Sequence, residues 1–168
     1  MLRAGVIGLG DMGSGLAKNL IKNGIATTGL DLSDERMSAF VEMSGTPAGS
    51  VAELGTNSDA VFVMVMNGVQ AKAVILGHDG LAAHMPKGGA VILTATIKPS
   101  EARDIGAALE GSGIHLIDSP VSGGFPGAQG GTLTMMAAAG SDVLDQYTPI
   151  MDAVSKTIHR VGTRAGDG

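Results

Sequence analysis

Three glycines near the start of the chain constrain its fold more than any other feature. Gly8, Gly10 and Gly13 have the spacing G-x-G-x-x-G, and an apolar run that starts at Ala4 leads into them. Residues 11–23 then carry apolar side chains at helical spacing. A strand that turns through glycines into a helix begins a βαβ unit, so the sequence predicts an α/β fold with a parallel sheet.

The same glycines suit a phosphate site. The first allows a sharp turn off the strand, the second lets the backbone approach a pyrophosphate, and the third lets the helix pack on the sheet. The helix N-terminus offers free N–H groups. A turn that binds nothing is the alternative, but it does not explain why the next predicted strand, residues 26–30, ends in an acid. We predict a dinucleotide site formed by Gly8, Leu9, Gly10, Asp11, Met12, Gly13 and Asp31.

Asp31 favours NAD over NADP. Its carboxylate can accept the hydroxyls of the adenine ribose and would repel a 2′-phosphate. Leu32, Ser33 and Asp34 follow it, and the nearest arginine, Arg36, is expected on the next helix. The alternative role for Asp31 is a helix N-cap, which Ser33 or Asp34 fills better. NAD is therefore the expected cofactor, with NADP less favoured.

Length and composition restrict the partners. A chain of 168 residues with 44% hydrophobic residues suits one domain with a proper core. A net charge of −5 and an aromatic content of 2% argue against nucleic-acid and anionic-membrane partners. The absence of cysteine excludes disulfides and thiol catalysis. We expect a cytoplasmic location and no metal site, because no metal-ligand spacing links His78, His84, His115 and His159.

Predicted strands and helices alternate over the first two thirds of the chain. The continuous apolar run at 60–66 is typical of a strand buried on both faces of a parallel sheet. The alternation predicts a Rossmann-type doubly wound, mostly parallel sheet with helices on both faces. The predicted strands are 3–9, 26–30, 47–48, 60–66, 89–94 and 114–117, and the predicted helices are 11–23, 33–43, 50–54, 68–76 and 100–110.

The pattern changes after residue 117. Residues 118–131 are rich in turn formers and are expected to lack regular structure. A strand at 132–139, a helix at 142–154 and a strand at 157–161 then extend the same sheet, with an edge strand of mixed orientation.

The turn-rich stretch carries a second chemical motif. Ser122, Gly123 and Gly124 lie just beyond a predicted strand end, where ligands of open α/β sheets bind. Consecutive backbone N–H groups and the serine hydroxyl could hold a substrate carboxylate. An ordinary turn is the alternative for these three residues alone, but they belong to a longer pattern over residues 118–133.

The chain resembles the β-hydroxyacid dehydrogenase family, which includes 3-hydroxyisobutyrate, tartronate semialdehyde and L-threonate dehydrogenases and is related to 6-phosphogluconate dehydrogenase. The family's cofactor signature G-L-G-x-M-G-x-x-x-A-x-N-L matches residues 8–20. Its substrate signature D-x-P-V-S-G-G-x-x-x-A-x-x-G-T-L matches residues 118–133. Met66-Asn67, His84 and residues 158–162 are most similar to the L-threonate dehydrogenase branch.

Two further motifs of the family are matched with departures. Its L-P-N motif corresponds to residues 65–67, where Met66 replaces the proline and Asn67 is kept. Its S-T-I-x-P motif corresponds to residues 95–99, where Ala95 replaces the serine and Thr96 is kept. The resemblance implies that Met66, Asn67 and Thr96 lie by the nicotinamide end of the cofactor. It implies an oxidoreductase that transfers hydride between NAD(P) and a 3-hydroxy acid.

The resemblance also implies a domain division. Residues 1–162 would be the dinucleotide-binding domain and residues 163–168 the start of an interdomain segment, with the family's all-helical C-terminal domain absent from this chain. The family's catalytic lysine lies in a G-x-G-x-x-x-K stretch, and Gly166-Asp167-Gly168 looks like its G-x-G. That lysine would fall beyond Gly168, so no catalytic residue is assigned. We expect this chain to bind cofactor without efficient turnover, and to form a homo-oligomer when full length.

Two other functions are considered. A non-catalytic dinucleotide-binding module would not need the substrate signature over residues 118–133. An imine reductase-like fragment would usually prefer NADPH, which Asp31 disfavours, and would not need the anion site at Ser122.

Overall fold

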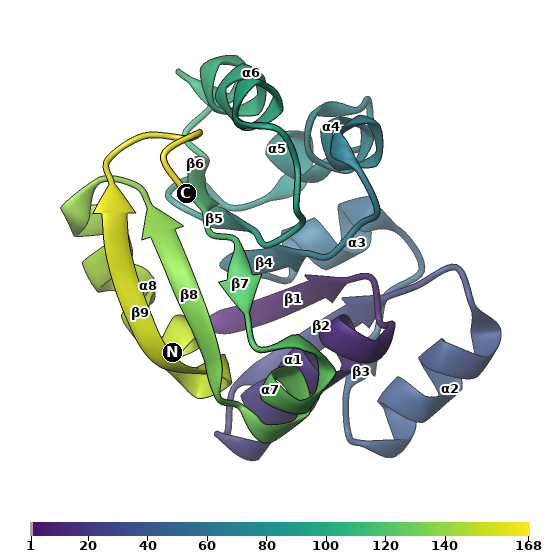
Figure 1. Ribbon diagram of the computed structural model, residues 1–168. Helices are drawn as coiled ribbons and strands as arrows, with labels where there is room; N and C mark the ends of the chain where they lie inside the picture. The colour runs from purple at the N-terminus through teal and green to yellow at the C-terminus, as the bar shows by residue number, and fades with distance from the viewer. Residues whose placement is uncertain (1) are drawn as a thin grey trace.

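One sheet runs through residues 2–168, the part of the chain that the computed structural model describes. Its strands lie in the order β3-β2-β1-β4-β5-β6-β8-β7, with β9 paired to β8 (Figure 1). The fold is therefore the predicted α/β class. The strands are β1 (Arg3–Ile7), β2 (Ala26–Leu30), β3 (Thr46–Pro47), β4 (Ala60–Val63), β5 (Ala90–Leu93), β6 (His115–Asp118), β7 (Val121–Ser122), β8 (Leu133–Ala138) and β9 (Ser155–Gly162).

The sheet reverses its winding direction at β1. This strand pairs in parallel with β2 on one side, where Val6 lies opposite Gly29, and with β4 on the other, where Val6 lies opposite Phe62. Such a switch point leaves a crevice at the carboxyl ends of the strands, which is where open α/β sheets bind ligands. The loop after β1 therefore lies at the position that the topology makes available to a ligand.

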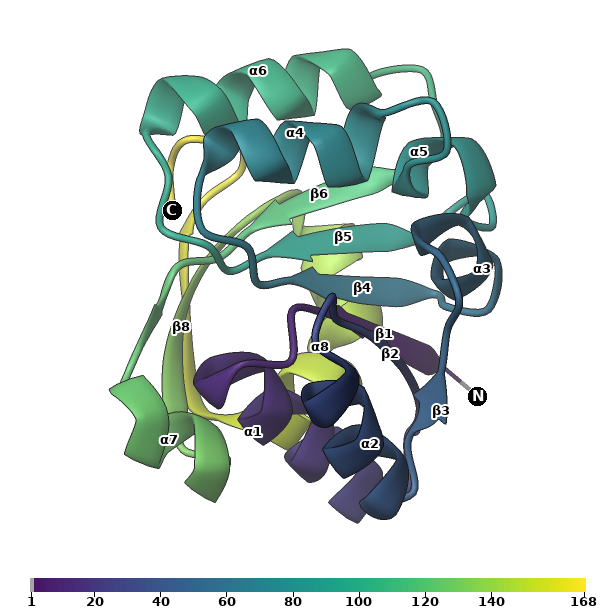
Figure 2. The ribbon, with the colours of Figure 1, turned by 90° about the vertical axis from the view of Figure 1, so that its right-hand side faces the viewer.

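Helices cover both faces of the sheet (Figure 2). In this view α4, α5 and α6 lie on one side, whereas α1, α2 and α8 lie on the other. The helices are α1 (Asp11–Lys22), α2 (Asp34–Glu42), α3 (Val51–Thr56), α4 (Gly68–Leu76), α5 (Leu81–His84), α6 (Pro99–Leu109), α7 (Gly124–Gly130) and α8 (Ser141–Val154).

Successive residues of the central strands belong to two different cores. In β4, Phe62 packs in the cluster under α1 and α8, while Val61 and Val63 pack in the cluster under α3 to α6. Alternate side chains of a strand point to opposite faces, so only an apolar run can satisfy both cores. The prediction for the run at 60–66 is confirmed in type, although the strand itself ends at Val63.

The last part of the sheet is a separate βαβ unit. Strands β8 and β9 are parallel to one another and are joined by α8. This unit is antiparallel to its neighbours, and its ladder contact with β6 is the single pair Asp118 and Ala138. The mixed orientation that the sequence predicts is therefore located at β8.

The segment 118–131 contains more regular structure than we expected. It forms the short strand β7, which pairs with β8, and then the helix α7. The sequence of α7, GFPGAQG, is poor in helix formers, so its helical conformation depends on packing against the rest of the protein. The short helix α5 was also missed.

An ion pair joins the starts of β1 and β4. The Arg3 backbone N–H donates to Asp59 Oδ2 at 2.8 Å, and Arg3 Nη2 lies 3.2 Å from Asp59 Oδ1. Burial alone would raise the pKa of Asp59, but the hydrogen bonds from the side chain and backbone of Arg3 outweigh it and lower that pKa.

This pair makes acid stability depend on Asp59. A carboxyl with a lowered pKa stabilises the fold above its unfolded pKa of about 3.9, and this contribution is lost as the pH falls through the lower folded pKa. When the pH is lowered below about 4, the free energy of unfolding of the Asp59→Asn variant should therefore fall less than that of the wild type. Urea unfolding at a series of pH values measures this, with Asp152→Asn, an exposed acid on α8, as the control. Parallel pH profiles for wild type and Asp59→Asn would contradict the prediction.

Candidate functional site

The turn between β1 and α1 requires glycine at two of its three glycine positions. Gly8 has a φ of +93°, and a Cβ there would overlap the carbonyl oxygen of Met64. A Cβ on Gly13 would overlap the carbonyl oxygen of Gly8 itself. The chain therefore folds back on itself so closely that side chains are excluded at both positions.

Gly10 differs from these two glycines. Its φ is −69°, which any residue adopts, and a Cβ there would lie 3.7 Å from the Arg36 guanidinium carbon, an ordinary contact. The fold by itself thus tolerates a side chain at this position. A side chain would instead cover the backbone that Gly10 leaves accessible at the N-cap of α1.

The N-terminus of α1 is available to an anion. Gly10 caps the helix without any side-chain hydrogen bond. The first N–H groups of a helix have no acceptor within the helix, and they carry the positive end of its dipole. Leu9 is buried and Asp11 is exposed beside this turn. The residues therefore fit the pyrophosphate of a dinucleotide.

Asp31 is bonded to the same loop. Its Oδ2 accepts a hydrogen bond from the Leu9 N–H at 2.7 Å, and its Oδ1 accepts one from the Ser33 N–H at 2.8 Å. The side chain is only 9% exposed, so the carboxylate both braces the loop and presents little of its surface outward. Ser33, one of the two predicted candidates, caps α2 in place of Asp31 by accepting from the Arg36 N–H.

Arg36 comes closer to this site than its place in the sequence suggests. Its Nη1 lies 3.7 Å from Asp31 Oδ2, and the guanidinium lies over Gly10. The Arg36 side chain is 56% exposed. It lies in the first turn of α2, which brings it back over the end of β2. Sequence reasoning left it aside because it is not adjacent to Asp31.

A cavity of about 570 Å³ adjoins the loop. It lies between the N-terminal turns of α1 and α2, and its polar lining includes Asp11, Ser14, Ser33, Glu35 and Arg36. Three residues predicted for the cofactor site, Leu9, Gly10 and Asp11, are among those that line it.

The residues predicted for the nicotinamide end follow the neighbouring strands β4 and β5. Asn67 caps α4, with its Oδ1 accepting from the Gln70 N–H at 2.9 Å. The Met66 N–H donates to Gln70 Oε1 at 2.8 Å, and the Met66 side chain is 85% exposed. Thr96 is exposed just beyond β5. All three lie beyond the carboxyl ends of their strands, on the same edge of the sheet as the glycine loop.

Ser122, Gly123 and Gly124 are exposed where β7 passes into α7. Gly123 has a φ of +127° and Gly124 a φ of +57°, so the turn between strand and helix requires glycine at both. The preceding Asp118 is buried, and its Oδ2 accepts hydrogen bonds from the N–H groups of Gly166 at 2.7 Å and Gly168 at 3.3 Å. The segment 163–168 is thereby held against the substrate signature.

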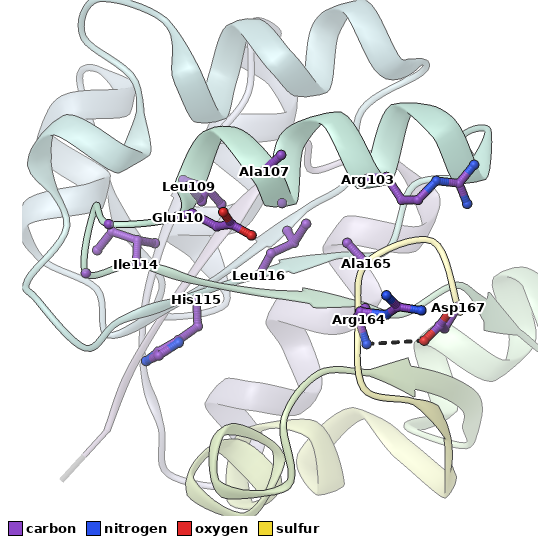
Figure 3. A pocket seen from close by; sticks show the side chains of 13 residues that line it. Arg103, Ala107, Leu109, Glu110, Ile114, His115, Leu116, Arg164, Ala165 and Asp167 are labelled. Atoms are coloured by element: carbon purple, nitrogen blue, oxygen red, sulfur yellow. Dashed lines mark hydrogen bonds between the residues drawn. The ribbon is translucent and has the colours of Figure 1, made fainter.

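A larger cavity, of about 880 Å³, lies between α6 and the segment 163–168 (Figure 3). Its charged lining consists of Arg103, Glu110, Arg164 and Asp167, with His115 at the start of β6. None of the residues predicted from the sequence for a site lines this cavity.

Residues 2–168 offer neither a metal-binding cluster nor a helix that could span a membrane. This part of the chain contains no group of three or more histidine or acidic side chains that could hold a metal ion. Within the same range, every helix is too short or too polar to cross a membrane.

Comparisons with known proteins agree with this geometry. Residues 3–162 match the family described as the NAD binding domain of 6-phosphogluconate dehydrogenase. The chain is 37% identical over 164 residues to L-threonate dehydrogenase of Cupriavidus necator, a match that covers 98% of this chain and 55% of that protein. The crystal structure of 3-hydroxyisobutyrate dehydrogenase from Salmonella typhimurium has a TM-score of 0.94 at 32% identity, covering 100% of this chain and 59% of that one.

A second similar structure bears on the cofactor. The structure of Psf3 in complex with NADP+ and 2-OPP is 25% identical with a TM-score of 0.91, and the match covers 97% of this chain and 57% of that one. Similar proteins thus do not decide between NAD and NADP.

The winding of the sheet and the glycine loop at its switch point define a Rossmann-type NAD(P)-binding domain. More particularly, the chain belongs to the family of NAD-binding domains of 6-phosphogluconate dehydrogenase, the type found in hydroxyacid dehydrogenases. The resemblance drawn from the two signatures is confirmed. The chain spans about half the length of the curated relatives it matches, 55% for the L-threonate dehydrogenase.

Proposed function

We propose that this chain binds NAD and supplies the cofactor half of an enzyme that oxidises a 3-hydroxy acid. The observation that carries the proposal is the glycine loop. Gly8 and Gly13 are required by the fold, whereas Gly10 is not, and Gly10 caps a helix whose N-terminus has no side-chain cap. Bound NAD would supply the hydride acceptor, and the chain would supply position and charge.

Each predicted residue has a role in this proposal. The loop of Gly8, Leu9, Gly10, Asp11, Met12 and Gly13 holds the pyrophosphate, and Asp31 accepts from the adenine ribose. Met66, Asn67 and Thr96 flank the nicotinamide end. The substrate carboxylate is held by Ser122, Gly123 and Gly124. The name of one relative, L-threonate dehydrogenase, supports this kind of ligand because threonate is a carboxylate.

The proposed domain division follows the family. Residues 1–162 form the dinucleotide-binding unit, and residues 163–168 begin an interdomain segment. The support is that the family match ends at residue 162, and that Gly166 and Gly168 are bonded to Asp118 next to the proposed substrate site.

Calorimetric titration of the chain with NADH, and separately with NADPH, tests the proposed function. Saturable binding with a lower Kd for NADH is the expected result. Tighter binding of NADPH would overturn the assignment of NAD and favour an imine reductase-like function. Failure of both titrations with a folded chain would overturn the proposal of a cofactor domain.

We expect Arg36 to determine the affinity of the chain for NADPH. Its exposed guanidinium is the positive group beside Asp31 that a 2′-phosphate would meet. Hydrogen bonds to charged groups contribute about 1.5–3 kcal/mol, and the exposure of Arg36 favours the low end, so Arg36→Ala should raise the Kd for NADPH about tenfold. The Kd for NADH should change much less. The control is Arg160→Ala on β9, where the arginine pairs with Asp145 instead. An equal effect of Arg36→Ala on both cofactors would contradict this role.

A further inference from the structure

Helix α7 lies directly against α1, the helix that begins at the glycine loop (Figures 1 and 2). A Cβ on Gly15 of α1 would come within 2.6 Å of the Ala128 carbonyl carbon of α7. The two backbones are therefore in contact, without intervening side chains at this point.

Asn19 joins the two helices from the α1 side. It is buried, at 5% exposure, and its Nδ2 donates to the carbonyl oxygens of Ala128 at 2.9 Å and Gln129 at 3.1 Å. These carbonyls belong to the last turn of α7, where a helix leaves acceptors free, although the Ala128 oxygen also accepts from the Gly131 N–H at 3.4 Å. The same Nδ2 lies 2.9 Å from the Gly15 carbonyl oxygen of its own helix. Asn19 thus satisfies the C-terminal end of α7.

Gln129 joins them from the α7 side, and it reaches the glycine loop. Its Nε2 donates to the Asp11 carbonyl oxygen at 3.2 Å and to Ser14 Oγ at 3.3 Å. Both acceptors lie in the first turn of α1, the turn proposed to hold the pyrophosphate. A single side chain therefore contacts the cofactor turn from a helix that starts immediately after Ser122 and Gly123.

Helix α7 depends on these contacts. Gly124, Gly127 and Gly130 fall within its seven residues, and its N-terminus has no side-chain cap. Glycine is among the poorest helix formers, so the intrinsic stability of this segment is low. The conformation of the turn at Ser122–Gly124 is accordingly set by what holds α7 in place.

We propose that Asn19 and Gln129 are positioning residues that couple the dinucleotide loop to the carboxylate-binding turn, so that a pyrophosphate bound at α1 changes the environment of Ser122, Gly123 and Gly124. The inference rests on the proposed function, because it takes the loop and the turn as the cofactor and substrate sites. The coupling is reciprocal: an anion bound at the turn strengthens cofactor binding by the same factor.

ADP is the probe that tests this coupling. It carries the diphosphate that the loop would hold, but it lacks the nicotinamide half that would lie beside Ser122 and perturb it directly. Amide resonances of the ¹⁵N-labelled chain are followed by NMR during titration with ADP. We expect shifts at residues 8–13, and smaller shifts at residues 122–124 that follow the same binding curve.

The variant Gln129→Met removes the two bonds to α1 and keeps the length of the side chain. It should retain the wild-type fold and bind ADP with a Kd within about threefold, while the shifts at residues 122–124 fall by about half or more. The matched control is Gln146→Met on α8, whose amide donates to Tyr147 Oη at 3.4 Å. Asn19→Ala should give the same uncoupling, but Gln129→Met decides the matter if that buried substitution fails to fold.

The outcomes separate the two proposals. Unchanged shifts at residues 122–124 in Gln129→Met would overturn the coupling, as would wild-type shifts confined to residues 8–13. Either result would leave the cofactor site in place. An absence of shifts throughout the wild-type spectrum would instead count against the cofactor site itself, and the coupling would fail with it.

Discussion

Replacing Gly13 with alanine should unfold the chain or leave it severely destabilised. The new Cβ would overlap the carbonyl oxygen of Gly8, which is backbone and cannot rotate away. Overpacking costs typically 1–3 kcal/mol when side chains can adjust, so a backbone collision should cost about 3 kcal/mol or more. That is a large fraction of the roughly 5–15 kcal/mol that stabilises an ordinary domain.

Chemical unfolding measured by circular dichroism tests this expectation. The control is Gly140→Ala, because Gly140 does not require a positive φ and a Cβ there meets nothing within 4 Å. Gly140 caps α8, where alanine is less favourable than glycine, so Gly140→Ala should lose about 1 kcal/mol or less. A Gly13→Ala protein as stable as this control would mean that α1 can move away from the loop, and the close packing inferred at β1 would be wrong.

Replacing Gly10 with alanine should have the opposite profile, a folded protein that has lost cofactor affinity. The free chain has room for this Cβ, which would lie 3.7 Å from the nearest atom, the Arg36 guanidinium carbon. A bound pyrophosphate would need the same space. If the added methyl costs the 1–3 kcal/mol typical of overpacking, the Kd for NADH should rise by about 5- to 150-fold.

Calorimetry with NADH and a thermal melt of the same preparation measure the two halves of this prediction. A Tm close to that of the wild type, together with weakened binding, is the expected pair of results. Unaltered NADH affinity in Gly10→Ala would show that the pyrophosphate does not approach the backbone at this position. The contrast between Gly10 and Gly13 thus separates a glycine kept for a ligand from a glycine kept for the fold.

The parts of the fold that were predicted are those in which local pattern and tertiary burial agree. The apolar run at 60–66 predicts a strand because residues such as Val61 and Phe62 each enter a different core. The turn at Gly8 was predicted because its conformation is inaccessible to other residues. Ser33 or Asp34 was predicted as the cap because both residue types accept from the free N–H groups of a helix start, and Ser33 is the one that caps α2.

The parts that were missed depend on contacts between distant segments. Helix α7 is too rich in glycine to be predicted from propensity, and it is held by Asn19, which precedes Ala128 by 109 residues. Arg36 was discounted by its sequence distance from Asp31, although one helical turn brings it back to within 3.7 Å. Asp31 itself was predicted as a ligand for ribose. Its bond to the Ser33 N–H is the local kind that an aspartate in a turn makes, whereas its bond to Leu9 joins residues 22 apart and depends on the loop geometry.

The single ladder pair between β6 and β8 has a consequence for how the last strands are anchored. Besides the pair of Asp118 and Ala138, the unit of β8, α8 and β9 is attached by its apolar packing, by a hydrogen bond from the Met136 N–H to the Pro120 carbonyl oxygen, and by the Tyr147 hydroxyl, which donates to the Gly88 carbonyl oxygen at 2.6 Å. Strand β7 is paired to β8 through Val121 and Ser122, so it belongs to this unit and not to the parallel part of the sheet. The proposed carboxylate turn is therefore anchored to the last βαβ unit of the chain, and a change in the packing of α8 would reach it through β8.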